Sequence, residues 1–202
     1  MTVYAIGNNL LSGSHSKEGS PAIWTIISGA SILQGGNPFF VPDFASRFEA
    51  LPAIGIKIGK LGKGIAPRLA YRYVDSVAPC ILFAATDLLH DLRQQGLPWT
   101  PAVSYDKCLA IGKFIKIPFT ETNECRVTLH LGGQDPTGDK VWTGKLTGPT
   151  AEEALSAIST DNTLKTGDII LLGIAGEGAC VSPGMKAVLS LNDGEPLRFN
   201  IR

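Results

Sequence analysis

The residues that could hold a metal ion are few in the central part of this chain. Between Phe48 and Leu89, a stretch that contains two strand-like segments, the only acids are Glu49, Asp75 and Asp87. The four cysteines, at positions 80, 108, 125 and 180, contain no C-x-x-C pair. Because structural zinc sites draw on closely spaced thiolates, the cysteines predict buried, reduced thiols and no zinc site.

The overall composition excludes several classes of function. With 202 residues, of which 44% are hydrophobic and 18% charged, the chain has the composition of one globular domain. Its 18 basic and 18 acidic residues cancel, and this balance argues against a nucleic-acid partner. The N-terminus lacks a basic segment followed by an apolar run, and no stretch is apolar enough to span a membrane. We therefore expect a cytoplasmic protein without a membrane or nucleic-acid partner.

Two central segments have the patterns of buried strands. In "AIGIKIGKLGKGI", Ile54, Ile56 and Ile58 alternate with small or polar residues, which is typical of a strand. The "KLGKGI" that ends this segment predicts a turn, and "APCILFAA", residues 78–85, predicts a second buried strand. Both segments therefore predict strands in the core of the protein.

The remaining elements predict an α+β protein that is mostly β. "TDLLHDLRQQG" has the pattern of a helix capped by Thr86 and ended by Gly96. "TAEEALSAIS" begins with a capping box between Thr150 and Glu153. A short helix is expected around Pro67. Further strands are predicted in "TVYAIG", "ECRVTLHLGG", "KVWTGKL", "LKTGDIILLG" and a C-terminal hairpin, "MKAVLSLNDGEPLRFNIR". The segment "AIWTIISGASIL" predicts a buried strand interrupted at Ser28 and Gly29.

Several of these segments, in this order, resemble one enzyme family. They are "NPFFVPDF", "KIGKLGKGIAPRLAYRYVDS", "FAATDL", "GLPW", "IGKF", "LKTGDIILLG" and "GEPLRFNI". The chain is similar to the fumarylacetoacetate hydrolase (FAH) family, and most of all to its short, single-domain bacterial members. The resemblance implies a mixed β-roll of curled sheets with a few peripheral helices. It would form a single domain over residues 1–202, with an N-terminal segment at 1–45 and the core roll at 46–202.

The resemblance also implies a metal site, which this sequence does not fill. Family members hydrolyse, isomerise or decarboxylate small dicarboxylic or β-diketo acids, using Mg²⁺ held by a Glu-x-Glu pair and an Asp on the next strand. Counted without gaps from "KLGKGI" and "APRLAYRYVD", these ligand positions fall on Leu51, Ala53 and Leu82. A hard cation needs oxygen ligands, which hydrocarbon side chains cannot provide. We therefore expect no Mg²⁺ and no other metal cofactor.

One short pattern matches the catalytic pair of the family. His15 and Glu18 fit the H-x-x-E arrangement that activates water in family members, although they lie two residues later than expected after "GNN". The same loop, "SGSHSKEGS", is rich in glycine and serine, and a solvated polar loop is the alternative interpretation. His15 and Glu18 are the candidate catalytic residues.

Three functions are open at this point. The first is a pseudoenzyme that binds a small molecule or a protein. The second is a metal-independent isomerase, tautomerase or hydrolase of small keto or dicarboxylic acids, in which His15 and Glu18 transfer protons. The third is a non-catalytic subunit paired with an active paralogue. Because family members commonly dimerise, we expect a homodimer.

Overall fold

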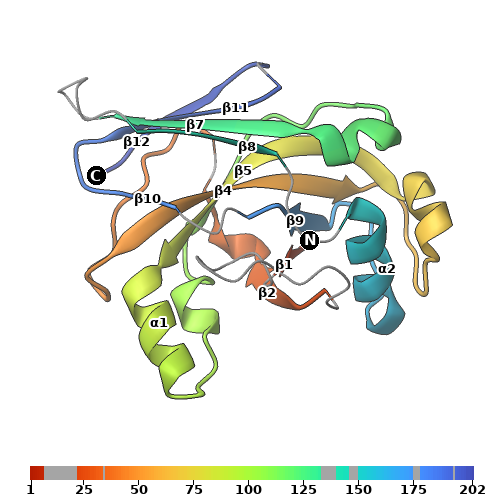
Figure 1. The fold of residues 1–202 in the computed structure, drawn as a ribbon, viewed down its shortest axis with the longest axis horizontal. Helices are drawn as coiled ribbons and strands as arrows, with labels where there is room; N and C mark the ends of the chain where they lie inside the picture. The colour runs from red at the N-terminus through yellow and green to blue at the C-terminus, as the bar shows by residue number, and fades with distance from the viewer. Residues whose placement is uncertain (7–21, 34, 133–139, 146–149, 175–177, 193) are drawn as a thin grey trace.

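Two β-sheets of unequal size pack against each other and carry short helices at their ends (Figure 1). The computed structural model describes the whole chain except residues 7–21, 34, 133–139, 146–149, 175–177 and 193. The larger sheet contains β1 (Thr2–Ile6), β2 (Trp24–Ser28), β3 (Ile32–Leu33), β4 (Phe48–Ile58), β5 (Val74–Ala85), β6 (Leu109–Ile111), β9 (Ile169–Leu172) and β10 (Ala179–Cys180). The smaller sheet contains β7 (Arg126–Gly132), β8 (Lys140–Lys145), β11 (Lys186–Leu191) and β12 (Leu197–Asn200).

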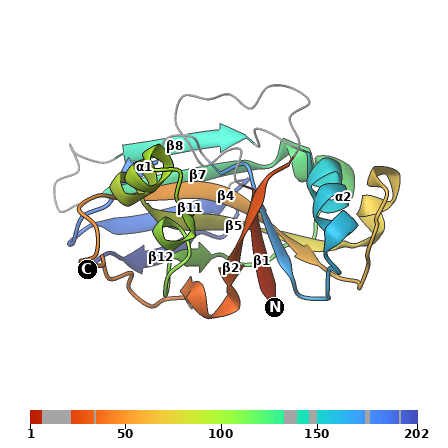
Figure 2. The same ribbon diagram turned by 90° about the horizontal axis from the view of Figure 1, so that it is seen from below.

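The helices lie at the periphery. In Figures 1 and 2, α1 and α2 occupy opposite ends of the molecule. The helical segments are α1 (Thr86–Gln94), α2 (Ala151–Asp161) and the short 3-10 helices η2 (Gly29–Ser31), η3 (Pro67–Arg72), η4 (Thr100–Ala102) and η5 (Phe119–Glu124). This mostly β architecture with few helices confirms the predicted fold class. No helix in the described part of the chain has the length and apolarity needed to cross a membrane.

The antiparallel pair β4–β5 is the centre of the larger sheet. The strand order is β2-β1-β9-β4-β5-β6-β3, and β10 pairs with β4 outside this path. Ten of the eleven residues of β4, from Phe48 to Ile58, are buried, and Lys57 is partly buried. A strand buried on both faces loses the usual alternation of apolar and polar residues. The two strands predicted here are present as β4 and β5, and both are longer than the apolar segments from which they were predicted.

Aromatic side chains join the two sheets. On β5, the ring of Phe83 stacks on Phe39 with 3.8 Å between centroids, and it meets Phe199 of β12 edge-on at 6.0 Å. Phe83 thus points toward the smaller sheet. Because neighbouring residues of a strand point to opposite faces, Leu82 points away from it, into the curl of the larger sheet.

The helix predictions are correct in position but not in every detail. The capping box of α2 is confirmed, since Glu153 N donates to Thr150 Oγ1 and Thr150 N donates to a carboxylate oxygen of Glu153. Thr86 does not cap α1: it is the first helical residue, and its buried hydroxyl has no hydrogen-bond partner. The helix expected around Pro67 is the six-residue 3-10 helix η3, which ends before β5 begins.

One strand prediction overestimated burial. The segment "AIWTIISGASIL" was expected to be a buried strand interrupted at Ser28 and Gly29. It is interrupted there by η2, but β2 is an edge strand on which Ile26 is 50% exposed. An edge strand has a neighbour on one side only, so its apolar residues do not guarantee burial.

Candidate functional site

The register of β4 and β5 brings together the three residues that the sequence placed at the ligand positions. Leu51 lies directly opposite Leu82, and Ala53 lies opposite Cys80. Directly opposed residues share a face, and so do residues two apart on one strand. Leu51, Ala53 and Leu82 therefore form one cluster, in which their exposed fractions are 2%, 1% and 0%.

Two glycines leave room for the side chains of this cluster. A Cβ atom at Gly178 would lie 2.6 Å from Cδ2 of Leu51, closer than any real side chain tolerates. A Cβ atom at Gly55 would lie 2.7 Å from Sγ of Cys80. The hydrocarbon and the thiol thus pack directly on backbone. The cluster is filled by the chain's own atoms.

A charged pair lies beside this cluster, at the start of β4. Glu49 is on the same face as Leu51, one pleat earlier, and is 9% exposed. Nη2 and Nε of Arg47 donate to Oε1 of Glu49 at 2.6 Å and 2.9 Å. The Sγ atom of Cys180 on β10 lies 4.0 Å from the same oxygen. The carboxylate nearest to Leu51 along β4 is therefore already neutralised by an arginine.

The sequence did not reveal this pairing. Cys180 is 131 residues from Glu49, and only the antiparallel pairing of β10 with β4 brings them together. Arg47 precedes β4 by one residue, and a single exposed arginine carries no signal of its own.

These residues do not fit a Mg²⁺ ion. The side chains of Leu51, Ala53 and Leu82 contain no oxygen atom, and one oxygen of Glu49 already accepts two charged hydrogen bonds from Arg47. Nowhere in the described part of the chain do three or more His, Cys, Asp or Glu side chains gather closely enough to hold a metal ion. A divalent cation needs several charged oxygens to offset the loss of its water shell, and the side chains of this cluster contain no carboxylate.

Two buried thiols are poor nucleophiles: Cys80, which lies opposite Ala53 in the cluster, and Cys108, which directly precedes β6. Burial raises the pKa of Cys80, which is fully buried. Burial likewise raises the pKa of Cys108 to about 11. Because the thiolate is the reactive form, both groups stay protonated and unreactive near neutral pH. Cys80, Cys108 and Cys125 are buried as predicted, whereas Cys180 is only partly buried.

The candidate catalytic pair cannot be placed. His15 and Glu18 lie outside the described residues, so their position relative to Leu51, Ala53 and Leu82 stays a prediction.

Comparison with known proteins identifies the family. The model of the fumarylacetoacetate (FAA) hydrolase C-terminal family matches residues 5–202. The chain belongs to the fumarylacetoacetate hydrolase family. The FAH fold is supported by the structure of fumarylpyruvate hydrolase from Pseudomonas aeruginosa in complex with Mn²⁺ and pyruvate, which matches with a TM-score of 0.83 and 18% sequence identity. The match covers 100% of this chain and 89% of that one. The structure of 5-carboxymethyl-2-hydroxymuconate delta-isomerase from Mycobacterium smegmatis also supports the fold, with a TM-score of 0.80 and 18% sequence identity. The match covers 99% of this chain and 76% of that one.

Several curated relatives of this FAH-family chain are named for oxaloacetate chemistry. The mitochondrial oxaloacetate tautomerase FAHD1 of Mus musculus is 28% identical over 141 residues, which are 68% of this chain and 62% of that protein. The mitochondrial oxaloacetate decarboxylase of Dictyostelium discoideum is 27% identical over 189 residues, 90% of this chain and 84% of that protein. The match to the mouse protein thus spans less than two thirds of its length.

Proposed function

We propose that this chain is a non-catalytic member of the FAH family. It keeps the fold but lacks the metal-dependent chemistry that the family resemblance implies, and it does not share the oxaloacetate activity for which its curated relatives are named. The observation that carries this proposal is the cluster of Leu51, Ala53 and Leu82, which are opposed in register, almost fully buried and without a single oxygen donor. Its role is then to bind, either a small keto or dicarboxylic acid or another protein, as a cytoplasmic homodimer.

The physical basis is the difference between a carboxylate site and a hydrocarbon one. Three carboxylates held together repel one another until a cation neutralises them. Such a site therefore lowers the folding stability of the metal-free protein. Leucine and alanine remove that repulsion and add favourable apolar burial. The cluster therefore stabilises the metal-free fold, which fits selection for binding better than selection for turnover.

Metal binding and turnover test the proposal directly. We expect the protein to show no Mn²⁺ binding by electron paramagnetic resonance at millimolar concentrations and no EDTA-sensitive conversion of oxaloacetate or of an acylpyruvate. Mn²⁺ bound at one ion per chain, or turnover that EDTA abolishes, would overturn it.

A reconstructed site provides the positive control. The triple variant Leu51→Glu, Ala53→Glu, Leu82→Asp restores the carboxylates at the three positions. Its matched control carries Gln, Gln and Asn there. We expect Mn²⁺ to raise the melting temperature of the acidic variant only, since an ion that binds the folded state stabilises it. Circular dichroism shows whether either variant fails to fold. In that case the proposal is tested by Mn²⁺ binding and turnover of the wild-type protein alone.

The metal-independent alternative makes a different prediction. Turnover that survives EDTA and is lost in both His15→Ala and Glu18→Gln would replace the present proposal with acid–base catalysis by that pair. Turnover that appears only after a paralogous chain is added would support the paired-subunit alternative.

A further inference from the structure

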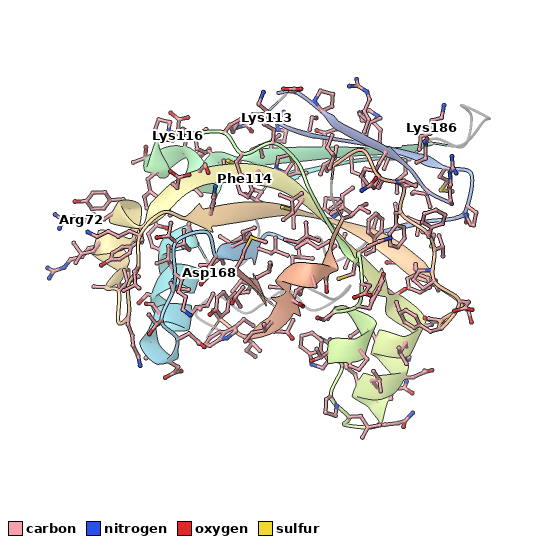
Figure 3. The ribbon with its side chains drawn as sticks, turned by 180° about the vertical axis from the view of Figure 1, so that it is seen from behind. Arg72, Lys113, Phe114, Lys116, Asp168 and Lys186 are labelled. Carbon is pink, nitrogen blue, oxygen red and sulfur yellow. The ribbon has the colours of Figure 1, made fainter. Side chains whose placement is uncertain are left out.

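The outer face of the smaller sheet carries basic and uncharged side chains. On β7, β11 and β12, the buried residues alternate with residues that point away from the larger sheet. The exposed outer face carries the cations Arg126, Lys186 and Arg198, with His130 among them, and we call these four residues the basic sheet face. Figure 1 shows the smaller sheet along one edge of the molecule, and Figure 3 places Lys186 at that edge.

The strand register places three of these side chains close together. Val188 of β11 lies opposite His130 of β7 on one side and opposite Arg198 of β12 on the other. Lys186, two residues from Val188, is therefore diagonal to both His130 and Arg198, at about 7–8 Å. His130 and Arg198 are separated by two strand spacings, about 10 Å. The three groups form a triangle on a pleated, solvent-facing surface.

Acidic groups do not balance this face from within the sheet. None of the four strands contains an Asp or a Glu. In the described part of the chain, His130, Lys186 and Arg198 make no ion pair with a carboxylate. Glu195, in the connection between β11 and β12, is paired with Lys113 at 2.8 Å. The face is thus positive in a protein whose formal net charge is zero.

The side chains between the cations suit contact with a protein surface. Thr128, Val188 and Ser190 lie on the outer face and are partly buried. The outward positions of β7, β11 and β12 include no aromatic residue. Single-stranded nucleic acids are usually held by stacking on aromatic rings, so this face lacks their main source of affinity.

A second copy of the chain does not fit this face either. A two-fold interface brings the same patch of both subunits together. The cations of both copies would then be gathered in one interface that supplies no acidic group from the strands, and like charges at an interface repel each other.

We propose that the basic sheet face binds an acidic surface of another protein. Opposite charges across such an interface steer the encounter and set its specificity, while the small residues between the cations allow close approach. This inference goes beyond the loss of metal chemistry: it depends on the outer face of the smaller sheet and not on the cluster between β4 and β5.

A labelled poly-glutamate peptide is the probe, and fluorescence anisotropy at low and physiological salt is the measurement. The charge-reversal variant is Lys186→Glu with Arg198→Glu. Its matched control is Lys63→Glu with Arg68→Glu, which changes the net charge equally at two exposed residues outside the sheet. We expect the first pair to weaken binding about tenfold or more and the second to weaken it less than about twofold. Both variants should melt at the wild-type temperature.

Amide chemical shifts then locate the contact. Shifts that change with the peptide should be confined to β7, β11 and β12. Equal losses in the two variants, or shift changes elsewhere, would overturn the proposal. So would tighter binding of duplex DNA or phosphatidylserine vesicles than of poly-glutamate, or a dimer in which the face is covered by a second copy.

Discussion

At the scale of single residues, the cluster depends on how closely backbone approaches it. Leu51 occupies the space above Gly178, and a Cβ atom there would also meet Cβ of Glu49 at 2.8 Å and the carbonyl oxygen of Ala50 at 2.9 Å. The Cβ atom of Glu49 and the carbonyl oxygen of Ala50 cannot move without shifting β4, whereas Cδ2 of Leu51 is the end of a side chain. A glycine at position 178 is therefore required by the packing of Leu51, whatever the chain binds.

Replacing this glycine tests the packing. We expect Gly178→Ala to lower the free energy of unfolding by about 1–3 kcal/mol, because the added methyl group forces the strand or the leucine to move. Urea denaturation measures the change. Gly35→Ala is the control, since a Cβ atom at Gly35 has no neighbour within 4 Å. Equal stability of Gly178→Ala and the wild type would show that Leu51 is not tightly held.

At the scale of elements, the carboxylate of Asp87 connects the start of α1 to the start of β4. Its Oδ2 accepts hydrogen bonds from the backbone N–H groups of Ser46 at 2.7 Å and Arg47 at 3.1 Å. Burial alone would raise the pKa of Asp87. The hydrogen bonds from Leu88, Ser46 and Arg47 outweigh burial and hold the pKa below its ordinary value of 3.8. Asp87, and not Thr86, secures this end of the helix.

This connection predicts a pH dependence. Because the pKa of Asp87 is lower in the folded state, the unfolded state binds more protons as the pH falls. The ionised Asp87 therefore contributes fully to folding stability above about pH 4–5, and this contribution is lost as pH falls through the folded pKa. We expect Asp87→Asn to cost about 0.5–1 kcal/mol at pH 7, a modest value because water screens the site. The difference from wild type should shrink below about pH 4 in denaturation series. Asp91→Asn, on the same helix, is the control; an identical pH profile for both variants would contradict the assignment.

At the scale of the whole molecule, the two sheets are held together by aromatic packing. Phe83 is completely buried and contacts Phe39 from the connection before β4 and Phe199 from β12. It is on the opposite face of β5 from Leu82, so the sheet interface and the cluster are separate. Changes at one of them need not disturb the other.

Truncating this ring should weaken the whole fold. We expect Phe83→Ala to cost about 3–5 kcal/mol in the free energy of unfolding, since it removes a large buried ring between two sheets. Calorimetry should show one cooperative transition at a lower temperature. Phe40→Ala, at a ring that is 54% exposed, should change stability by less than about 1 kcal/mol. Two separate transitions in Phe83→Ala would mean that the sheets unfold independently.

Local patterns predicted much of this protein from its sequence. The alternation around Ile54, the capping box at Thr150 and the pairing of β11 with β12 in a C-terminal hairpin depend on neighbours close in sequence, and all three are present. The absence of carboxylates at positions 51, 53 and 82 is also a property of the sequence alone. Thr86 shows the limit: its type suits a cap, but the backbone of β5 continues into the helix one residue earlier than a cap requires.

Tertiary structure alone decided what surrounds those three positions. Leu51 faces Leu82 because of the register of β4 and β5, Gly178 approaches from a distant part of the chain, and Arg47 neutralises Glu49. The cations of β7, β11 and β12 likewise become one face only when the strands pair. Contacts between residues far apart in sequence follow from global packing, and no local pattern encodes them.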